Sequence, residues 1–397
     1  MDNGRRPKLL YLAHRFPYPP DKGDRIRTFH IVRELAGVAD VHLAALADEA
    51  VADADLRELQ RYCRRVAVVR LSRWGRWAQA LTALARGRTA TEGAFHSAAL
   101  GATVDDWSAE VGFDAVVASA SSMVPYLRRA SLRGVPAVVD LVDVDSEKWL
   151  SYAAASRGPT AWLYRVEGRR LRRLERELPR WTWAVTLVST AEADVYRRFA
   201  APGTIRAITN GVDLHYFQPT PTADEQGCVF VGALDYRPNV DGVCWFCHAV
   251  WPELRQRAPQ ARLVLVGRRP VPAVRRLAAV PGVEVAGTVP DVRPFVARAA
   301  VVVVPLRIAR GVQNKVLEAL AMGKAVVASP EALEGLQVTP GTHALAASTP
   351  GEWVEAISDL FSDSALRDRL GAAGRRYVEE HHRWEHCLAP LRDLVMG

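Results

Sequence analysis

The chain alternates short apolar runs with longer stretches that have helical spacing. The first apolar run covers residues 8–13 and stops at a Pro-rich loop, FPYPPDKGDR. A helical pattern follows over residues 25–36, and a second apolar run covers residues 41–46. Near-continuous apolar runs of this length are typical of strands that are buried on both faces. The opening therefore predicts a strand, a loop, a helix and a second strand.

The same alternation continues in two series. The first series predicts further strands at residues 115–118, 135–140 and 183–189. The second series predicts strands at residues 228–231, 261–266, 283–286, 300–304 and 325–328. Strands that alternate with helices favour parallel sheets with helices on both faces. We therefore predict an α/β protein with two doubly wound, Rossmann-like domains.

A segment rich in Pro, Thr, Asp and Gly, residues 218–227, separates the two series and has the composition of a linker. We predict an N-terminal domain over residues 1–215 and a C-terminal domain over residues 216–375. Residues 376–397 are predicted to form a C-terminal helix that crosses back to the first domain. A chain of 397 residues fits this division, because single cores stop growing beyond roughly 250 residues.

Composition and charge narrow the class of protein. The chain is 49% hydrophobic and 24% charged, as folded proteins are, and its net charge of +8 favours anionic partners. No apolar run approaches the roughly 18 to 20 residues of a membrane span, and no signal peptide is recognisable, so we expect a cytoplasmic location. The basic residues are dispersed and no nucleic-acid-binding module is present, so nucleic acid is not an expected partner.

The cysteines do not predict a disulfide framework, because they are five in number and scattered over a long chain. Cys244 and Cys247 form a lone CxxC, which we interpret as core thiols. The chain contains no Gly-x-Gly and no P-loop. This argues against two classes of enzyme, the nicotinamide dehydrogenases and the P-loop phosphotransferases. HExxH and EF-hand patterns are also missing from the sequence, so no metal site is predicted.

The stretch after the apolar run 301–304 carries the clearest candidate chemistry. It predicts a loop over residues 305–311 and a helix over residues 312–322, with Gly323 in the position of a terminating glycine. The first helical turn and Lys315 would attract phosphate, and Glu318 could accept hydrogen bonds from a ribose diol. The alternative is that Lys315 and Glu318 form a surface ion pair on a helix that only packs.

Two further candidate groups lie in the first domain. Gly23, Asp24 and Arg25 end the loop after the first strand, where a glycine turn opening onto a helix can approach a sugar or phosphate. The alternative is a turn glycine and a capping aspartate. Asp143 and Asp145, with Asp140, follow a predicted strand at the edge where ligands bind. Their alternative role is to cap the next helix through Asp145 and Ser146.

Three motifs resemble the retaining family-4 glycosyltransferases of GT-B fold. The first is the stretch from Lys315 to Ser329, KVLEALAMGKAVVAS, followed by Glu-Gly-Leu at residues 334–336. The second is ITNGVD at residues 208–213 with Phe217, and the third is VGALDYRPN at residues 231–239. The segments HRFPYPPDKGDRIR, DLVDVDSEKW and RGVQNKVLEA look most like the transferases associated with PEP-CTERM/exosortase exopolysaccharide loci.

This resemblance implies two Rossmann-like domains facing a central cleft, and retaining transfer of a hexosyl group from a UDP- or GDP-linked sugar without a further cofactor or metal. In that family the second Glu of the motif binds ribose, a position that Glu318 occupies, whereas Arg310 stands where a sugar-binding Glu is usual. The implied donor-binding residues are Gly232, Arg237, Asn239, Gly311, Val312, Gln313, Asn314, Lys315 and Glu318. The implied acceptor-binding residues are Gly23, Asp24, Arg25 and Arg27, and the catalytic candidates are Asp143, Asp145 and Arg310.

The expected partners are therefore a nucleotide sugar and a glycan or lipid-linked acceptor. Two rival functions remain open: a nucleotide-sugar 2-epimerase of the same fold, and a catalytically silent binding or scaffold protein, which Arg310 keeps in consideration. Trp74, Arg76 and Trp77, next to Leu81 and Leu84, suit a helix that attaches peripherally to an anionic membrane surface on its inner face. An ordinary surface helix fits the same residues.

Overall fold

The computed structural model describes residues 5–220 and 225–396, which divide into two compact units. One unit comprises the residues up to Ile208 together with those from Leu388 onward, and the other comprises Thr209–Cys387. Residues 221–224, part of the predicted linker, lie outside the described residues. Each unit is built on one parallel sheet, as the alternation of apolar runs and helical patterns predicts.

The first unit has seven strands within its described residues, in the order β3-β2-β1-β4-β5-β6-β7. All neighbouring strands pair in parallel. The order reverses between β1 and β4, so the carboxyl end of β1 lies at the switch point where open sheets bind ligands. The strands are β1 Lys8–Ala13, β2 Asp40–Ala47, β3 Arg65–Arg70, β4 Ala115–Ser119, β5 Ala137–Val142, β6 Ala184–Leu187 and β7 Ile205–Ala207.

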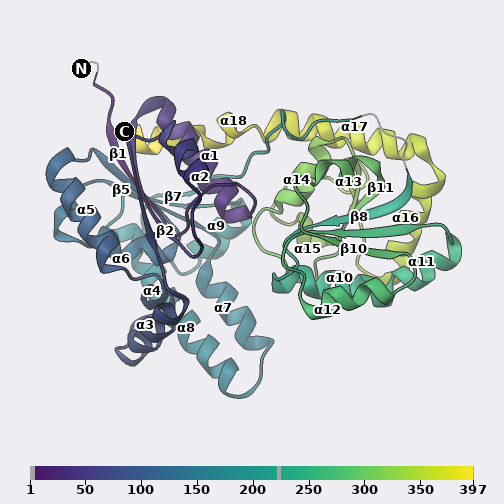
Figure 1. Cartoon of the computed structure of the whole chain (residues 1–397), viewed down its shortest axis with the longest axis horizontal. Helices are drawn as coiled ribbons and strands as arrows, with labels where there is room; N and C mark the ends of the chain where they lie inside the picture. Colours follow the sequence, from purple (N-terminus) through teal and green to yellow (C-terminus); the bar gives the residue numbers. More distant parts are fainter. Residues whose placement is uncertain (1–4, 221–224, 397) are drawn as a thin grey trace. The chain divides into compact units, whose positions relative to one another are not determined.

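Helices cover both faces of this sheet, and α3, α4, α7 and α8 gather at one end of it (Figure 1). Glu167 of α8 accepts hydrogen bonds from the backbone N–H groups of Ala90 and Thr91, at 2.6 and 2.9 Å, and so fixes the start of α4. The helices are α1 Gly23–Val38, α2 Asp53–Gln60, α3 Arg73–Ala85, α4 Ala90–Ala94, α5 Ala98–Val111, α6 Val124–Leu127, α7 Asp145–Ala154, α8 Gly158–Glu177 and α9 Thr190–Arg197.

The second unit repeats the topology with six strands in its described part, in the order β10-β9-β8-β11-β12-β13. Its switch point lies between β8 and β11. The strands are β8 Glu225–Val231, β9 Arg262–Val266, β10 Val283–Gly287, β11 Ala299–Val304, β12 Ala325–Ala328 and β13 Leu345–Ala346. The helices are α10 Arg237–Ala249, α11 Trp251–Arg257, α12 Pro272–Arg275, α13 Arg293–Arg298, α14 Asn314–Ala321, α15 Pro330–Leu333, α16 Pro350–Ser362 and α17 Ser364–His381.

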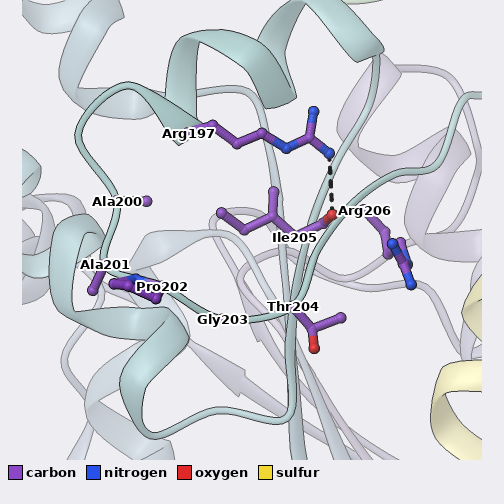
Figure 2. Close-up of a pocket in the computed structure, with 8 residues that line it drawn as sticks. All are labelled: Arg197, Ala200, Ala201, Pro202, Gly203, Thr204, Ile205 and Arg206. Carbon is purple, nitrogen blue, oxygen red and sulfur yellow. Dashed lines mark hydrogen bonds between the residues drawn. The ribbon is translucent and has the colours of Figure 1, made fainter.

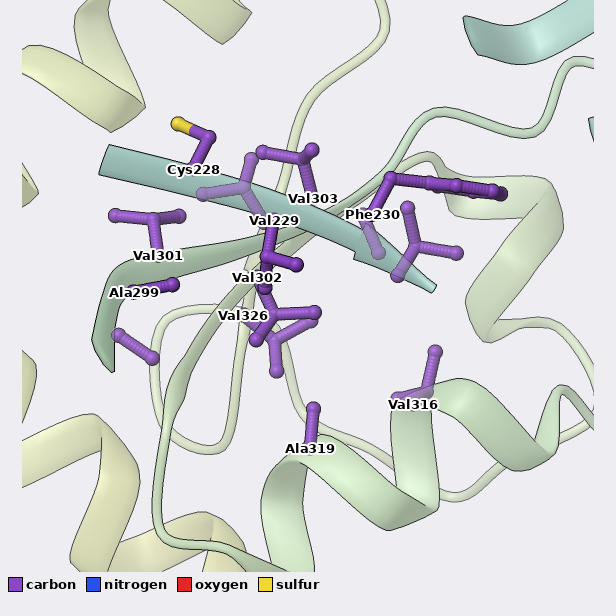
Figure 3. Packing of buried hydrophobic residues seen from close by; sticks show 14 of the residues in the cluster. Cys228, Val229, Phe230, Ala299, Val301, Val302, Val303, Val316, Ala319 and Val326 are labelled. Atoms are coloured by element: carbon purple, nitrogen blue, oxygen red, sulfur yellow. The ribbon is translucent and has the colours of Figure 1, made fainter. Parts of the chain in front are cut away.

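The core of the second unit explains why its apolar runs are so regular. Every residue of β11 is buried, and α14 presents Val316 and Ala319 toward the side chains of Val302 and Val326 (Figure 3). α14 ends as predicted at Gly323, which has φ +65°. The backbone N–H groups of Gly323 and Lys324 donate to Leu320 and Ala319, which is a complete Schellman motif.

Three of the described strands were not predicted from the sequence. β3 has the sequence RVAVVR and is half-buried at an edge of the first sheet, so arginines at both ends mask its apolar centre. β7 and β13 also lie at sheet edges and have only three and two residues. β5 begins two residues later than predicted and extends to Val142. Short or half-exposed edge strands have little apolar pattern to detect.

The residues after Ile208 group with the second unit because they bind its last helix. Val212 N–H donates to His382 C=O at 2.8 Å, and the His382 ring nitrogen Nδ1 lies 2.7 Å from Asn210 C=O. The C-terminal stretch forms two helices, α17 and α18 (Trp384–Met396), separated at His382. Residues from Leu388 onward group with the first unit, where Arg392 of α18 pairs with Glu34 of α1 at 3.4 Å.

Candidate functional site

The carboxyl edge of the second sheet brings together three of the predicted donor-binding residues. Gly232 directly follows β8, and Asn239 is near the start of α10. Lys315 Nζ donates a hydrogen bond to Asn239 Oδ1 at 2.6 Å and lies 4.7 Å from the centroid of the Phe230 ring. A Cβ atom added to Gly232 would lie 3.1 Å from Lys315 Nζ. Glycine therefore keeps the space above the lysine open at the switch point of this sheet.

The helix that follows β11 starts two residues later than predicted, at Asn314, with Gln313 as its N-cap. The Gln313 side chain does not cap the helix and instead donates to Arg310 C=O at 3.0 Å. Asn314 Oδ1 accepts from Asn210 Nδ2 at 2.9 Å. The sequence predicted residue 312 because Gly311 and Val312 resemble a helix start, but Gly311 has φ +63° and belongs to the loop.

Lys315 and Glu318 lie one turn apart and are only partly exposed, so they form no ordinary surface ion pair. Burial lowers the pKa of Lys315 to about 7, although the charge of Glu318 opposes this shift. Burial likewise raises the pKa of Glu318 to about 7, against the charge of Lys315. Such shifts are common at functional sites, where charged groups await a ligand.

The other predicted donor residues lie around this group. Arg237 is exposed at the first position of α10, two residues before Asn239. Val312 packs against the core, and Arg310 is half-buried in the loop after β11. Gly335 packs directly against this loop. A Cβ atom on Gly335 would lie 2.1 Å from the carbonyl oxygen of Gly311, so no larger residue fits there. Gly335 belongs to the Glu-Gly-Leu segment, so this motif has a steric role in placing the loop.

In the first unit, Gly23, Asp24 and Arg25 begin α1 beside the carboxyl end of β1. Arg15 Nη1 donates to Asp24 Oδ2 at 2.6 Å, and His14 Nε2 lies 3.5 Å from the same oxygen. Burial opposes ionisation of Asp24, but His14 and Arg15 outweigh it and lower its pKa strongly. Asp24 does not cap α1, since the N-cap is Lys22 and has no side-chain hydrogen bond.

Arg27 has a different environment from the one predicted. Its side chain is 1% exposed, and it makes a double hydrogen bond to the fully buried Asp140, with Nε and Nη2 each 2.8 Å from a carboxylate oxygen. Its Nη1 donates to Ile208 C=O at 2.9 Å, and Thr186 donates to Asp140 at 2.7 Å. These contacts give Arg27 a structural role in linking α1, β5 and β6, so its assignment to the acceptor is corrected.

Asp143 and Asp145 lie in the connection from β5 to α7. Asp143 N–H donates to Leu141 C=O at 2.9 Å, across Val142, which has φ +69°. A β-branched residue rarely adopts this conformation, and strained residues of this kind cluster at functional sites. Ser121 Oγ donates to Asp145 Oδ2 at 2.5 Å. The connection thus holds both carboxylates at the carboxyl end of β5.

Capping by Asp145 and Ser146 is not observed, because two glutamates from other helices perform that role for α7. Glu192 accepts from Val144 N–H at 2.8 Å, and Glu175 accepts from Ser146 N–H at 3.0 Å and from its hydroxyl. Burial, and next the charge of Asp145, raise the pKa of Glu175 to about 8. Neither glutamate could be predicted from the sequence, because each is distant from the start of α7 along the chain.

A hollow of about 620 Å³ lies elsewhere in the first unit, between α9 and β7 (Figure 2). It is lined by Arg197 and residues 200–206, and Arg197 Nη2 donates to Ile205 C=O at 3.2 Å. Residues 200–204 precede β7 and therefore lie at the amino end of an edge strand. Ligands of open α/β sheets bind at the opposite end, so this hollow is not the candidate site.

Residues 225–363, which lie within the second unit, match the family model described as glycosyl transferases group 1. No curated protein sequence matches the chain. Sucrose-phosphate synthase from Thermosynechococcus elongatus has a similar structure, with a TM-score of 0.71, 18% identity and 98% coverage of both chains.

HepE from Anabaena, solved with UDP and glucose, has a TM-score of 0.70 at 16% identity and covers 98% of this chain and 99% of its own. TarM has a TM-score of 0.71 at 8% identity, with both chains fully covered.

The fold is GT-B.

This GT-B chain has no helix, within residues 5–220 and 225–396, that is long and apolar enough to cross a membrane. In the same part of the chain, no group of three or more His, Cys, Asp or Glu side chains is arranged to hold a metal ion. The side chains gathered at the candidate sites of the two units are arginines, a lysine and carboxylates, next to glycines. Such groups bind phosphates and sugar hydroxyls.

Proposed function

We propose that the chain is a glycosyltransferase that moves a hexosyl group from a nucleoside diphosphate sugar to a glycan or lipid-linked acceptor with retention of anomeric configuration. The observation that carries this proposal is the coincidence of two features. The glycosyl transferases group 1 match covers residues 225–363, and the same segment contains Gly232, Asn239, Lys315 and Glu318 at the switch point of its sheet. The likeness to family-4 enzymes of PEP-CTERM/exosortase exopolysaccharide loci supports a role in surface glycan synthesis.

In this proposal the diphosphate of a UDP- or GDP-linked sugar binds at the start of α14. The free N–H groups of its first turn and the Lys315 ammonium stabilise the negative charge that develops on the leaving diphosphate. Glu318 accepts hydrogen bonds from the ribose hydroxyls one turn further along the helix. Arg310 lies before this turn and contacts the transferred sugar, to which it can only donate hydrogen bonds. Asp143 and Asp145 act from the acceptor side.

A nucleotide-binding experiment tests the donor site. Lys315→Ala should weaken UDP or GDP binding by about 1 to 3 kcal/mol, the range for hydrogen bonds to charged groups. Lys324→Ala is a matched control, because Lys324 is at the other end of α14 and donates to Ala297 C=O at 2.9 Å. Isothermal titration calorimetry measures both affinities. Equal nucleotide affinity in wild type and Lys315→Ala would contradict the assignment of Lys315 to the donor site.

Turnover separates the two rivals from the proposed activity. A transferase releases UDP or GDP only when an acceptor is present, whereas a 2-epimerase interconverts nucleotide sugars without net release. A scaffold protein does neither. Arg310 is the first residue to change, because Arg310→Glu restores the carboxylate that the resembling family carries there. If Arg310→Glu gains transfer that the wild type lacks, the wild type is a binding protein.

We also propose that α3 contacts an anionic membrane surface. Trp74, Trp77 and Leu81 lie at i, i+3 and i+7 and have exposed fractions of 86%, 69% and 63%. On the other side of the helix, Ala80 and Ala83 pack closely on α4: a Cβ on Gly93 of α4 would lie 2.6 Å from Ala83 Cβ and 2.9 Å from Ala80 Cα. Large apolar side chains that face outward from a helix typically mark an interaction surface.

The charge around α3 supports an anionic partner. Between Glu58 and Glu92 the only charged residues are arginines. Arginine and tryptophan together suit the headgroup region of anionic lipids. Flotation with liposomes tests this: wild type should float with anionic vesicles more than with neutral ones, and Trp74→Ala/Trp77→Ala should float less. Equal flotation with both kinds of vesicle would contradict the electrostatic part of the proposal.

A further inference from the structure

Charged side chains from several elements meet at the carboxyl ends of β1 and β2, beside the switch point between β1 and β4. His14 and Arg15 directly follow β1, and Asp48 directly follows β2. Arg15 Nε and Arg25 Nη2 each lie 3.8 Å from an oxygen of Asp48. Because ligands of open α/β sheets bind at this edge, the cluster has the position of a binding site.

The carboxylates of this cluster are already engaged. Asp24 accepts from Arg15 at 2.6 Å, and Asp21 accepts from Arg25 Nη1 at 3.2 Å. What remains is a surplus of donors: the buried Nε atoms of Arg15 and Arg25 have no hydrogen-bond partner among the described residues. Arginine can donate but not accept hydrogen bonds. A ligand here must supply acceptor oxygens.

Arg76 reaches the same cluster from α3. Its guanidinium carbon lies 4.8 Å from the centroid of the Phe95 ring, and the His14 ring contacts Phe95 edge-on at 5.9 Å. Burial, and next the charge of Arg15, lower the pKa of Arg76, with Asp48 opposing. In the part of the chain that the structure describes, no hydrogen bond or ion pair engages this half-buried guanidinium. A buried cation without such a partner is costly, which favours an anionic ligand.

We propose that Arg76 and Arg15 bind a phosphate group of the acceptor, and that this acceptor is a sugar joined through phosphate to an apolar lipid chain. A guanidinium can bind phosphate through two parallel hydrogen bonds, so the chemistry of both side chains suits this task. The inference rests on the proposed glycosyl transfer and names its acceptor class.

The two faces of α3 favour an acceptor that carries both a phosphate and a lipid chain. Arg76 lies on the side of the helix that meets Phe95, whereas Trp74 and Trp77 are exposed to solvent. A molecule with a phosphate between a sugar and an apolar chain presents an anion to Arg76 and hydrocarbon to the tryptophans. A free sugar or a water-soluble glycan offers neither feature. The helix thus matches a ligand with both chemistries.

The probe for this site is inorganic pyrophosphate, titrated into the full chain by calorimetry with saturating UDP present to fill the site in the second unit. Arg76→Gln should weaken pyrophosphate binding about 10- to 100-fold, which corresponds to the loss of charge-assisted hydrogen bonds. Arg86→Gln is the matched control, because Arg86 is the exposed C-cap residue that directly follows the same helix. It should leave the affinity unchanged.

Three results would overturn the proposal. The first is that the UDP-saturated protein does not bind pyrophosphate, and the second is that Arg76→Gln and Arg86→Gln lose equal amounts of pyrophosphate affinity. The third is that Arg76→Gln no longer floats with anionic vesicles but keeps its pyrophosphate affinity. The last result would show that Arg76 contacts phospholipid headgroups. Arg76→Lys and thermal unfolding check folding, and the lysine variant should retain part of the affinity. The titration is repeated with Lys315→Ala without UDP, so a failure of the donor site does not hide the acceptor site.

Discussion

The two sheets have the same strand order but use their charged residues differently at the carboxyl edge. In the first unit the carboxylates are paired within the protein: Asp140 with Arg27, and Asp24 with Arg15. In the second unit burial lowers the pKa of Lys315 and raises the pKa of Glu318, each against the charge of the other, and Gly232 leaves room beside Lys315 Nζ. In the first unit these carboxylates are neutralised by arginines, whereas in the second unit a lysine and a glutamate with shifted pKa values share one partly buried helical turn.

The family match follows this division, since it covers residues 225–363 and none of the first unit. A site for a nucleoside diphosphate needs the same few contacts whatever sugar is transferred. A site for an acceptor has to fit a particular molecule. The comparison therefore predicts that variants in the first unit act on stability or acceptor binding, and variants in the second unit act on nucleotide affinity.

The largest expected effect comes from Arg27→Ala, which leaves Asp140 as an unpaired charge in a fully buried position. Removing one partner of a buried ion pair costs about 3 to 5 kcal/mol. Hydrogen exchange by mass spectrometry should show faster exchange in β5, with β11 unchanged. Arg25→Ala is the control, because its partner Asp21 is 38% exposed and can be solvated. Equal exchange in β5 for both variants would contradict the structural role of Arg27.

An intermediate effect is expected from Gly335→Ala, because the added Cβ would lie 2.1 Å from Gly311 C=O and 3.0 Å from Val312 N. Overpacking of this kind costs about 1 to 3 kcal/mol. The loop after β11 must shift, so UDP affinity measured by calorimetry should fall. Gly351→Ala in α16 is the matched control, since nothing lies within 4 Å of its added Cβ. If the two variants bind UDP equally well, the loop position does not matter for the donor.

The smallest expected effect is a pH dependence of nucleotide binding. Lys315 has a pKa of about 7, so its ammonium loses its proton as the pH rises from 6 to 8. The ratio of wild-type to Lys315→Gln affinity for UDP should therefore fall with rising pH, by up to about tenfold if the charge carries the interaction. Taking the ratio cancels the titration of UDP itself. A ratio that stays constant over this range would mean that Lys315 binds UDP without its charge.

The sequence predicts the two-domain α/β fold because buried parallel strands leave continuous apolar runs, as in β1 and β11. It also predicts the end of α14 at Gly323, since the glycine and its left-handed backbone are local features. The predicted start of α14 is two residues too early, because Gly311 belongs to the preceding loop. The position of that loop depends on its close packing against Gly335, which is 24 residues away in the sequence. Local patterns cannot show such contacts.

The role of Arg27 could not be predicted for the same reason. Its position next to Asp24 and Arg25 resembles a ligand-binding loop, but the helical turn directs it to Asp140, which lies on β5. His14 and Arg15 could have been recognised, because they directly follow the first predicted strand. Arg76 and Phe95 could not, since only the packing of α3 and α4 brings them to that strand.

The small residues beneath α3 have a further consequence for its dynamics. Ala80 and Ala83 remove little apolar surface from water, while Trp74, Trp77 and Leu81 remain in solvent. Burial of apolar area contributes about 25 cal/mol per Å², so α3 is held to the first unit by far less free energy than the strands of its sheet. Local opening should begin there. Under the proposed membrane contact, the helix that carries Arg76 would be able to change its tilt without unfolding the sheet on which it rests.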